Sequence, residues 1–145
     1  MSLKGKKQAF KVARGEDGET TLQDYEITLD EGMVVLDCMH RIQHEKEPDM
    51  AVRWNCKAGK CGSCSAEING RPRLMCMTRM SDVVAETPEG QPIEIRPMKA
   101  FPHIKDLVTD VQWNYDIAQK IAPINGPEEM NWEFNQMEAD RVQHF

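Results

Sequence analysis

Four of the five cysteines in this 145-residue sequence stand close together, at separations that suit metal binding. Cys56, Cys61 and Cys64 occupy one glycine-containing segment and Cys76 follows farther along, which gives the spacing C-x4-C-x2-C-x11-C. Thiolate is a soft ligand, and sets of four thiolates in proteins commonly hold either an iron–sulfur cluster or structural zinc. Cysteine-based metal chemistry is therefore the first hypothesis for this chain.

The spacing of these cysteines favours a [2Fe–2S] cluster. The first three match the plant-type arrangement, in which one loop supplies three thiolates and a more distant residue supplies the fourth. Structural zinc sites usually show two short C-x2–4-C pairs, which a triplet and a single distant cysteine fit poorly. Gly59 and Gly62 would let backbone amides approach the sulfur atoms and donate hydrogen bonds to them. A four-cysteine zinc module that binds a partner without redox chemistry stays open as the alternative.

The same segment is basic, although the whole chain has a formal net charge of −6. Residues 51–80 contain six basic side chains and only one acidic side chain, Glu67. Positive charge beside an anionic cluster favours its more negative, reduced form and so raises its reduction potential. We expect Arg53, Lys57 and Lys60 to have this effect. The alternative is a solvated rim that docks on an acidic face of a partner, and the two roles are compatible.

Composition and the remaining pattern exclude several classes of protein. The acidic net charge argues against non-specific nucleic-acid binding. No run of 18 apolar residues is present, which argues against a membrane span, and the polar N-terminus lacks the apolar stretch of a secretory signal. These features predict a soluble, intracellular chain whose thiols stay reduced. Cys38 lies in a helical apolar pattern without a neighbouring cysteine, so it is expected to be a small buried residue rather than a ligand.

The elements that must position the cysteines follow from hydrophobic periodicity and turn signals. Asn69-Gly70 is a strong hairpin signal, and the pattern predicts strands on both sides of it. The expected strands are residues 8–14, 22–29, 65–68, 73–77 and 93–95, and the expected helices are residues 33–44, 103–122 and a short final one within 128–145. This order is typical of an α+β domain, with a small mixed sheet over one helix.

The run from Ala51 to Thr78 resembles the iron–sulfur subunit of succinate dehydrogenase and fumarate reductase, including the short gap before the fourth cysteine. Pro97 and the segment Ile104-Lys-Asp-Leu-Val-Thr-Asp resemble the passage to that subunit's next domain. The resemblance covers residues 8 to about 122. It implies a β-grasp, ferredoxin-like domain at residues 1–102 and a helical extension at residues 103–145. It also implies that one [2Fe–2S] cluster is bound by the four clustered cysteines, Cys56, Cys61, Cys64 and Cys76.

The resemblance further implies an electron-transfer module without an active site of its own. In that family, electrons pass between the FAD of a separate flavoprotein subunit, the [2Fe–2S] centre, later clusters and quinone. The implied partners are the flavoprotein subunit and, through a second domain, the membrane-anchor subunits. The complex would then lie peripherally on the cytoplasmic side of the cell membrane.

One departure from the family pattern concerns the second domain. The family binds further clusters there through C-x2-C-x2-C-x3-C-P runs, whereas no cysteine follows Cys76 in this sequence. We therefore expect the sequence to correspond to the N-terminal part of a longer subunit. The competing interpretations are a stand-alone [2Fe–2S] ferredoxin and an electron-transfer domain of another oxidoreductase, such as a molybdenum hydroxylase. Members of the hydroxylase family usually carry a second cysteine set, which is absent here.

Overall fold

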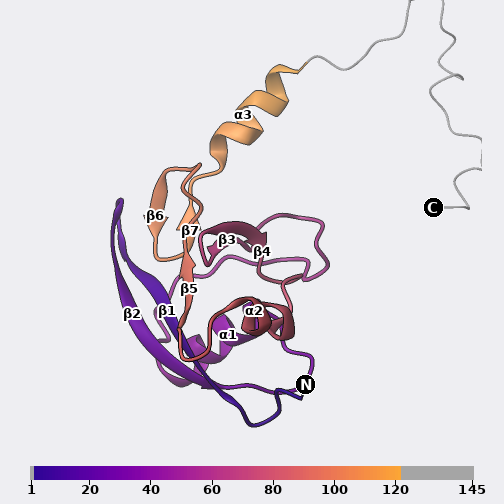
Figure 1. Ribbon diagram of the computed structural model, residues 1–145. Helices are drawn as coiled ribbons and strands as arrows, with labels where there is room; N and C mark the ends of the chain where they lie inside the picture. Colours follow the sequence, from indigo (N-terminus) through magenta and orange to yellow (C-terminus); the bar gives the residue numbers. More distant parts are fainter. Residues whose placement is uncertain (1, 122–145) are drawn as a thin grey trace, which may run out of the picture. The chain divides into compact units, whose positions relative to one another are not determined.

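The computed structural model describes residues 2–121, in which seven strands and three helices are defined (Figure 1). The chain divides into two units, Met1–Val111 and Gln112–Phe145. The first unit contains every one of these strands together with helices α1 and α2. Within the described residues, the second unit contains helix α3 (Gln112–Lys120).

A long antiparallel hairpin of β1 (Lys7–Glu16) and β2 (Glu19–Thr28) begins the first unit (Figure 1). Phe10 and Val12 on β1 are fully buried, as the alternating pattern predicts for a strand with one face on the core. Gly15 stands just before the turn at a φ of 144°, and a Cβ atom there would lie only 2.0 Å from the carbonyl oxygen of Glu19. Glycine is thus required for the two strands to close at this end.

A second hairpin, β3 (Ser65–Ile68) and β4 (Arg71–Leu74), joins the first through β5 (Ile93–Arg96). β5 runs parallel to β1 and antiparallel to β3, which gives a mixed sheet with the strand order β4-β3-β5-β1. Asn69 and Gly70 form the turn between β3 and β4 with φ values of 48° and 75°. These positive values are those of a type I′ hairpin turn, which Asn-Gly adopts readily.

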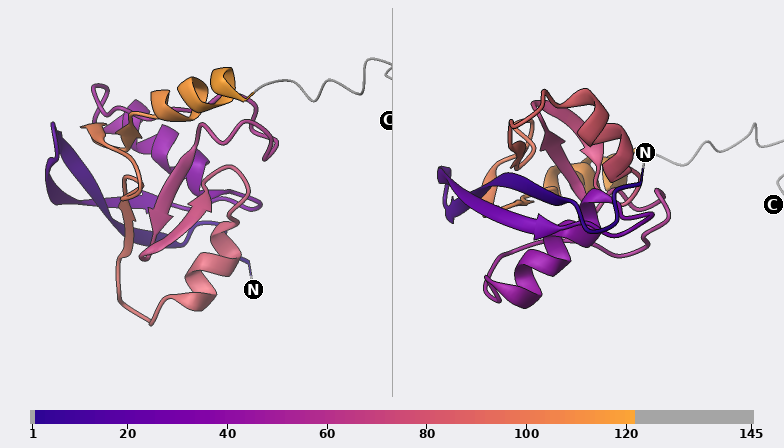
Figure 2. Two further views of the ribbon diagram at one scale, coloured as in Figure 1. Left: turned by 90° about the horizontal axis from the view of Figure 1, so that it is seen from above. Right: turned by 60° about the horizontal axis from the view of Figure 1, so that its bottom comes forward.

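Helix α1 (Val35–Glu45) packs against this sheet and contacts β2 (Figure 2). Its inward face is fully buried and consists of Val35, Leu36, Cys38, Met39 and Ile42. The expected burial of Cys38 is therefore confirmed. A mixed sheet with a helix packed on it is the predicted α+β class, and the central parallel pair β1 and β5 is the arrangement expected of a β-grasp domain.

The predicted helix over residues 103–122 is wrong in its first half. Residues 103–109 instead form a small hairpin of β6 (His103–Lys105) and β7 (Val108–Thr109), and α3 begins only at Gln112. The turn residue Asp106 has a φ of 49° and is buried, and its amide donates to the carbonyl oxygen of Gly15 over 2.8 Å. Contact with β1 therefore overrides a local apolar pattern that also fits a helix.

Two smaller differences concern the chain after the cysteine-rich loop. β4 ends at Leu74, before the predicted limit of residue 77, and the short helix α2 (Met80–Glu86) follows without having been predicted. Met80 and Val83 anchor α2 in the core. Seven residues supply too few turns for a clear helical period. The helix predicted within residues 128–145 lies outside the described residues.

Candidate metal centre

The four predicted ligands lie on two connections of the first unit. Cys56, Cys61 and Cys64 belong to the loop between α1 and β3, and Cys76 follows β4. Cys64 and Cys76 are 3% and 7% exposed, whereas Cys56 is half-buried and Cys61 is exposed. All four are free thiols, as is Cys38 in the core. The set therefore has a buried half and an outer half that faces solvent.

The backbone of the loop wraps around the sulfur of Cys56. Its Sγ atom accepts hydrogen bonds from the amides of Ala58, Lys60 and Cys61, at 3.3, 3.4 and 3.4 Å. Lys57 and Gly59 make this turn possible with positive φ values of 51° and 69°. Amide donors aimed at a sulfur atom stabilise its negative charge, so the loop is built for a thiolate at this position.

The other outer cysteine, Cys61, is also stabilised as a thiolate. Its Sγ atom accepts the amide of Ser63 at 3.5 Å. Hydrogen bonding with the Ser63 side chain, together with hydrogen bonds that involve Cys56, lowers the pKa of the Cys61 thiol to about 6. Burial has the opposite effect on Cys64, whose thiol pKa is raised. The outer position is thus the more readily ionised of the two.

The β3–β4 hairpin brings the inner cysteines together. The amide of Cys76 donates to the Sγ atom of Cys64 over 3.4 Å, and the amide of Met75 donates to the carbonyl oxygen of Cys64 over 3.1 Å. The first turn of α1 fixes the same strand end, because the amide of Leu36 donates to the carbonyl oxygen of Met75 over 3.1 Å. The helix, the hairpin and Cys76 therefore form one connected support.

The residues present fit a [2Fe–2S] cluster by their donor chemistry. Four free thiols flank a loop whose amides point at sulfur, and these are the ligands and the hydrogen bonds that such clusters take. No group of three or more His, Cys, Asp or Glu side chains suitable for one metal ion occurs in residues 2–121. A cluster with two irons distributes its four thiolates over both, so each iron takes two of them.

The basic residues near the loop have different surroundings. Lys57 places its Nζ atom 4.8 Å from the centroid of the Trp54 ring, a cation–π contact. Arg53 donates from Nη1 to the carbonyl oxygen of Thr109 over 2.9 Å, so it is part of the local structure as well as a charge. Trp54 is 47% exposed and meets His40 of α1 edge to face, with ring centroids 5.0 Å apart.

Sequence reasoning missed the pair formed by Trp54 and His40. The two residues come from different elements and are separated by the end of α1 and a connection, so no short-range pattern links them. The only signal was the position of Trp54, two residues before the first clustered cysteine. The pair gives the cysteine loop an aromatic flank on the side of α1.

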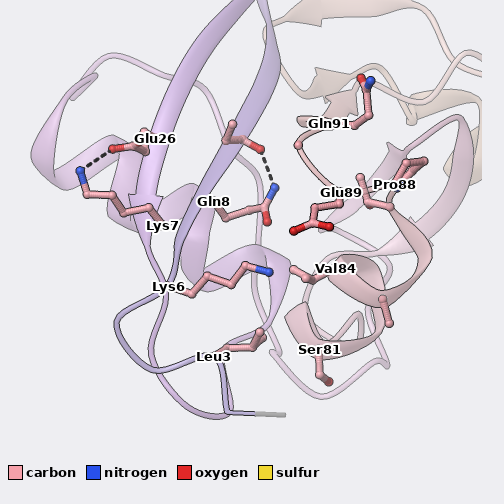
Figure 3. Close-up of a pocket in the computed structure, with 14 residues that line it drawn as sticks. Leu3, Lys6, Lys7, Gln8, Glu26, Ser81, Val84, Pro88, Glu89 and Gln91 are labelled. Atoms are coloured by element: carbon pink, nitrogen blue, oxygen red, sulfur yellow. Dashed lines mark hydrogen bonds and ion pairs between the residues drawn. The ribbon is translucent and has the colours of Figure 1, made fainter.

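A separate open pocket of about 770 Å³ lies between the start of β1 and α2 (Figure 3). Lys6, Gln8, Val84 and Glu89 are among the residues that line it, and Gln8 donates within it to the carbonyl oxygen of Ala9 over 3.1 Å. No cysteine or histidine is among its described lining residues. The pocket is therefore distinct from the candidate metal centre.

No helix in residues 2–121 has both the length and the apolar character needed to cross a bilayer.

Comparison with known families and structures places these features in a wider group. Residues 8–116 match the model of the 2Fe-2S iron-sulfur cluster binding domain. The chain is 37% identical over 91 residues to a fumarate reductase iron-sulfur subunit of Mycobacterium tuberculosis, a match that covers 63% of this chain and 35% of that protein. It is 32% identical over 109 residues to a succinate dehydrogenase iron-sulfur subunit of Coxiella burnetii, covering 74% of this chain and 43% of that protein.

A solved structure is also similar to this chain. A chain of the Mycobacterium smegmatis Sdh1 complex in the apo form superposes with a TM-score of 0.80 at 47% identity, covering 94% of this chain and 56% of that chain. The sequence thus spans less than half of the curated relatives described above and somewhat more than half of the matched chain of known structure.

Proposed function

The chain belongs to the family of 2Fe-2S iron-sulfur cluster binding domains, and from that premise we propose that it is the electron-transfer module of a succinate dehydrogenase or fumarate reductase iron–sulfur subunit. The observation that carries this proposal is the loop in which amide groups converge on the sulfur of Cys56 while Cys76 lies against Cys64. The relatives named above support the choice of complex.

Within this proposal, Cys56, Cys61, Cys64 and Cys76 are the ligands of one cluster. Their arrangement in two hydrogen-bonded pairs supports the assignment, because the amide of Cys61 donates to Cys56 and the amide of Cys76 donates to Cys64. Each pair would hold one iron, the outer pair near solvent and the inner pair against the core. Burial of Cys38 beside Met39 on the inner face of α1 supports its exclusion from the ligand set.

When bound, the cluster supplies one-electron transfer. The residues of the chain have three tasks in that process. The amides of Ala58, Lys60 and Cys61 stabilise negative charge on sulfur. The basic side chains of Lys57 and Lys60 favour the more negative, reduced state. The hydrophobic core beneath Cys64 and Cys76 excludes water from the inner half.

The proposed partner is an FAD-containing flavoprotein subunit, and the exposed outer half of the site with Trp54, Lys57 and Lys60 is the face on which we expect it to dock. We also propose that the first unit, Met1–Val111, is the cluster-binding domain, which places the boundary after the sequence-predicted limit of residue 102. Residues beyond it would lead toward a second domain, membrane-anchor subunits and quinone. The complex would lie peripherally on the cytoplasmic side of the membrane.

The test is direct electron transfer from a flavoprotein subunit. The chain is reconstituted with iron and sulfide, mixed with a succinate dehydrogenase flavoprotein and supplied with succinate, and cluster reduction is followed by loss of visible absorbance. We expect reduction that depends on both succinate and flavoprotein. A cluster that stays oxidised there, but is reduced by NADPH through a ferredoxin reductase, would support a stand-alone ferredoxin instead.

A further inference from the structure

The segment that precedes the cysteine loop has no regular secondary structure. Residues 51–54, which we call the stem, connect the segment after α1 to Cys56 and belong to no strand or helix. Their position must therefore be set by contacts with other elements. The hairpin β6–β7, which the sequence did not predict, provides these contacts and pairs with the end of β1 through Glu16 and Lys105 (Figure 1).

The carboxylate of Asp106, in the turn of this hairpin, is the centre of the contacts. Its Oδ2 atom accepts the amide of Ala51 in the stem over 2.8 Å. Its Oδ1 atom accepts the amide of Gly15 over 2.9 Å and the Nε–H of Arg14 over 3.0 Å. The Asp106 side chain is only 2% exposed, so these three donors satisfy it away from water.

Two further hydrogen bonds connect the hairpin to the stem. The amide of Leu107 donates to the carbonyl oxygen of Ala51 over 3.3 Å, so both backbone polar groups of Ala51 bond to the β6–β7 turn. Arg53 then donates to the carbonyl oxygen of Thr109 on β7 over 2.9 Å. The stem is thus attached to the hairpin at Ala51 and at Arg53. Cys56, the first of the four clustered cysteines, follows the stem in the sequence.

We propose that Asp106 is a positioning residue for the metal centre, acting through Ala51 to fix the stem and thereby the loop whose amides converge on the Cys56 sulfur. This inference rests on the proposed cluster, because the effect is on how the loop holds it. The potential of an iron–sulfur centre depends on hydrogen bonds to its sulfur atoms. A stem that moves would weaken those from Ala58 and Lys60 and destabilise the more negative state.

Asp106→Asn separates the positioning role from general stability. Asparagine keeps one carbonyl oxygen, which can still accept hydrogen bonds from the amide of Gly15 and from Arg14. Its NH2 group then faces the amide of Ala51, and two donors cannot form a hydrogen bond with each other. The stem bond is lost while the bond to β1 persists. The matched control is Asp49→Asn, because Asp49 also pairs with Arg14, at 3.1 Å, but has a 68% exposed side chain and no contact to the stem that the structure gives.

The experiment compares the reconstituted full chain and both variants by redox titration, by EPR of the reduced form and by the rate of cluster loss to a chelator. Relative to Asp49→Asn, which removes the same charge, we expect Asp106→Asn to lower the midpoint potential, to alter the EPR line shape and to speed cluster loss by about tenfold, the scale of one lost buried hydrogen bond. Asp49→Asn should match the wild type in all three. Wild-type values for Asp106→Asn, or equal changes in both variants, would overturn the proposal.

If Asp106→Asn does not fold, a second pair of variants tests whether the β6–β7 hairpin positions the stem. Arg53→Met removes the contact to Thr109, and Arg53→Lys retains a donor and the charge. We expect faster cluster loss and an altered EPR line shape for the methionine variant, with both restored by lysine. Wild-type behaviour of the methionine variant would contradict the role of the hairpin. A wild-type chain that binds no iron and sulfide would instead refute the proposed function, and so the two failures are distinguishable.

Discussion

The amide of Cys76 donates a hydrogen bond to the Sγ atom of Cys64 over 3.4 Å, across 12 positions of sequence. Both residues are buried, and the hairpin β3–β4 and the first turn of α1 fix their relative position. The outer cysteines, Cys56 and Cys61, are related in the same way by an amide that donates to sulfur over 3.4 Å. The site thus consists of two local pairs of cysteines with different exposure.

The ligand assignment predicts which cysteines are needed for iron. Replacement of Cys56, Cys61, Cys64 or Cys76 by alanine should remove the cluster, because one iron would lose one of its two thiolates. Cys38→Ala is the matched control, and it should keep full iron content while costing about 1 kcal/mol of stability for the small cavity. Iron and sulfide analysis of the five variants decides this. Full retention of iron in Cys76→Ala, or its loss in Cys38→Ala, would show that the assignment is wrong.

The two glycines of the loop should differ in their tolerance of alanine. Gly59 and Gly62 have similar φ values of 69° and 73°, so the left-handed conformation costs alanine about 1 kcal/mol at either site. Only at Gly59 would the added Cβ approach another side chain, lying 2.9 Å from Cγ of Met77. Gly59→Ala should therefore release iron to a chelator faster than Gly62→Ala.

A substitution of Met77 provides the control for Gly59→Ala. Met77 is 59% exposed, so truncation of its side chain costs little burial. Met77→Ala combined with Gly59→Ala should bring the rate of iron release back to that of Gly62→Ala. Equal rates for the two single glycine variants, or no rescue by the double variant, would mean that Met77 does not restrict this part of the loop.

The basic rim should raise the reduction potential of the centre. Lys57→Gln combined with Lys60→Gln removes two positive charges beside the loop, which favours the less negative, oxidised state. The midpoint potential should fall by on the order of tens of millivolts, a modest value because exposed charges are screened by salt. Lys4→Gln with Lys6→Gln removes the same charge from a segment that precedes β1 and serves as the control. A potential that is unchanged or raised by the rim variant would leave the rim as a docking feature alone.

His40 should make the stability of the fold depend on pH. Burial, followed by the positive charge of Lys57, lowers the pKa of His40 in the folded chain, and the charge of Asp37 opposes this. Its Nε2 atom is buried without a hydrogen-bond partner within residues 2–121. The unfolded chain takes up a proton at the ordinary pKa of about 6.5. The contribution of neutral His40 to the free energy of unfolding is therefore complete above that pH and declines as the pH falls below it.

Urea unfolding at a series of pH values measures this effect. His40→Leu should show a smaller loss of unfolding free energy than the wild type between about pH 7 and about pH 5, the range in which histidine titrates. His44→Leu removes the other histidine of α1 from an exposed position and controls for the change of residue type. Identical pH dependence in wild type and His40→Leu would contradict the desolvation assigned to the Nε2 atom of His40.

The sequence predicted the parts of the fold that depend on local pattern. Alternation along β1, the Asn69-Gly70 turn and the apolar face of α1 all have short-range signals, and the structure confirms them. The hairpin β6–β7 was not predicted because the contacts that stabilise it come from residues far away in the sequence. The carboxylate of Asp106 accepts hydrogen bonds from the amides of Gly15 and Ala51. The cysteine spacing identified the candidate ligands, but it did not indicate that Trp54 meets His40, which depends on how α1 lies against the loop.

One measurement tests the central claim most directly: the number of iron atoms, acid-labile sulfides and electrons that one reconstituted chain takes up. A [2Fe–2S] centre held by Cys56, Cys61, Cys64 and Cys76 predicts two irons, two sulfides and one electron per chain, with a visible absorption spectrum that bleaches on reduction. A colourless chain that binds one zinc ion, or an iron-loaded chain without sulfide that accepts no electron, would contradict the account.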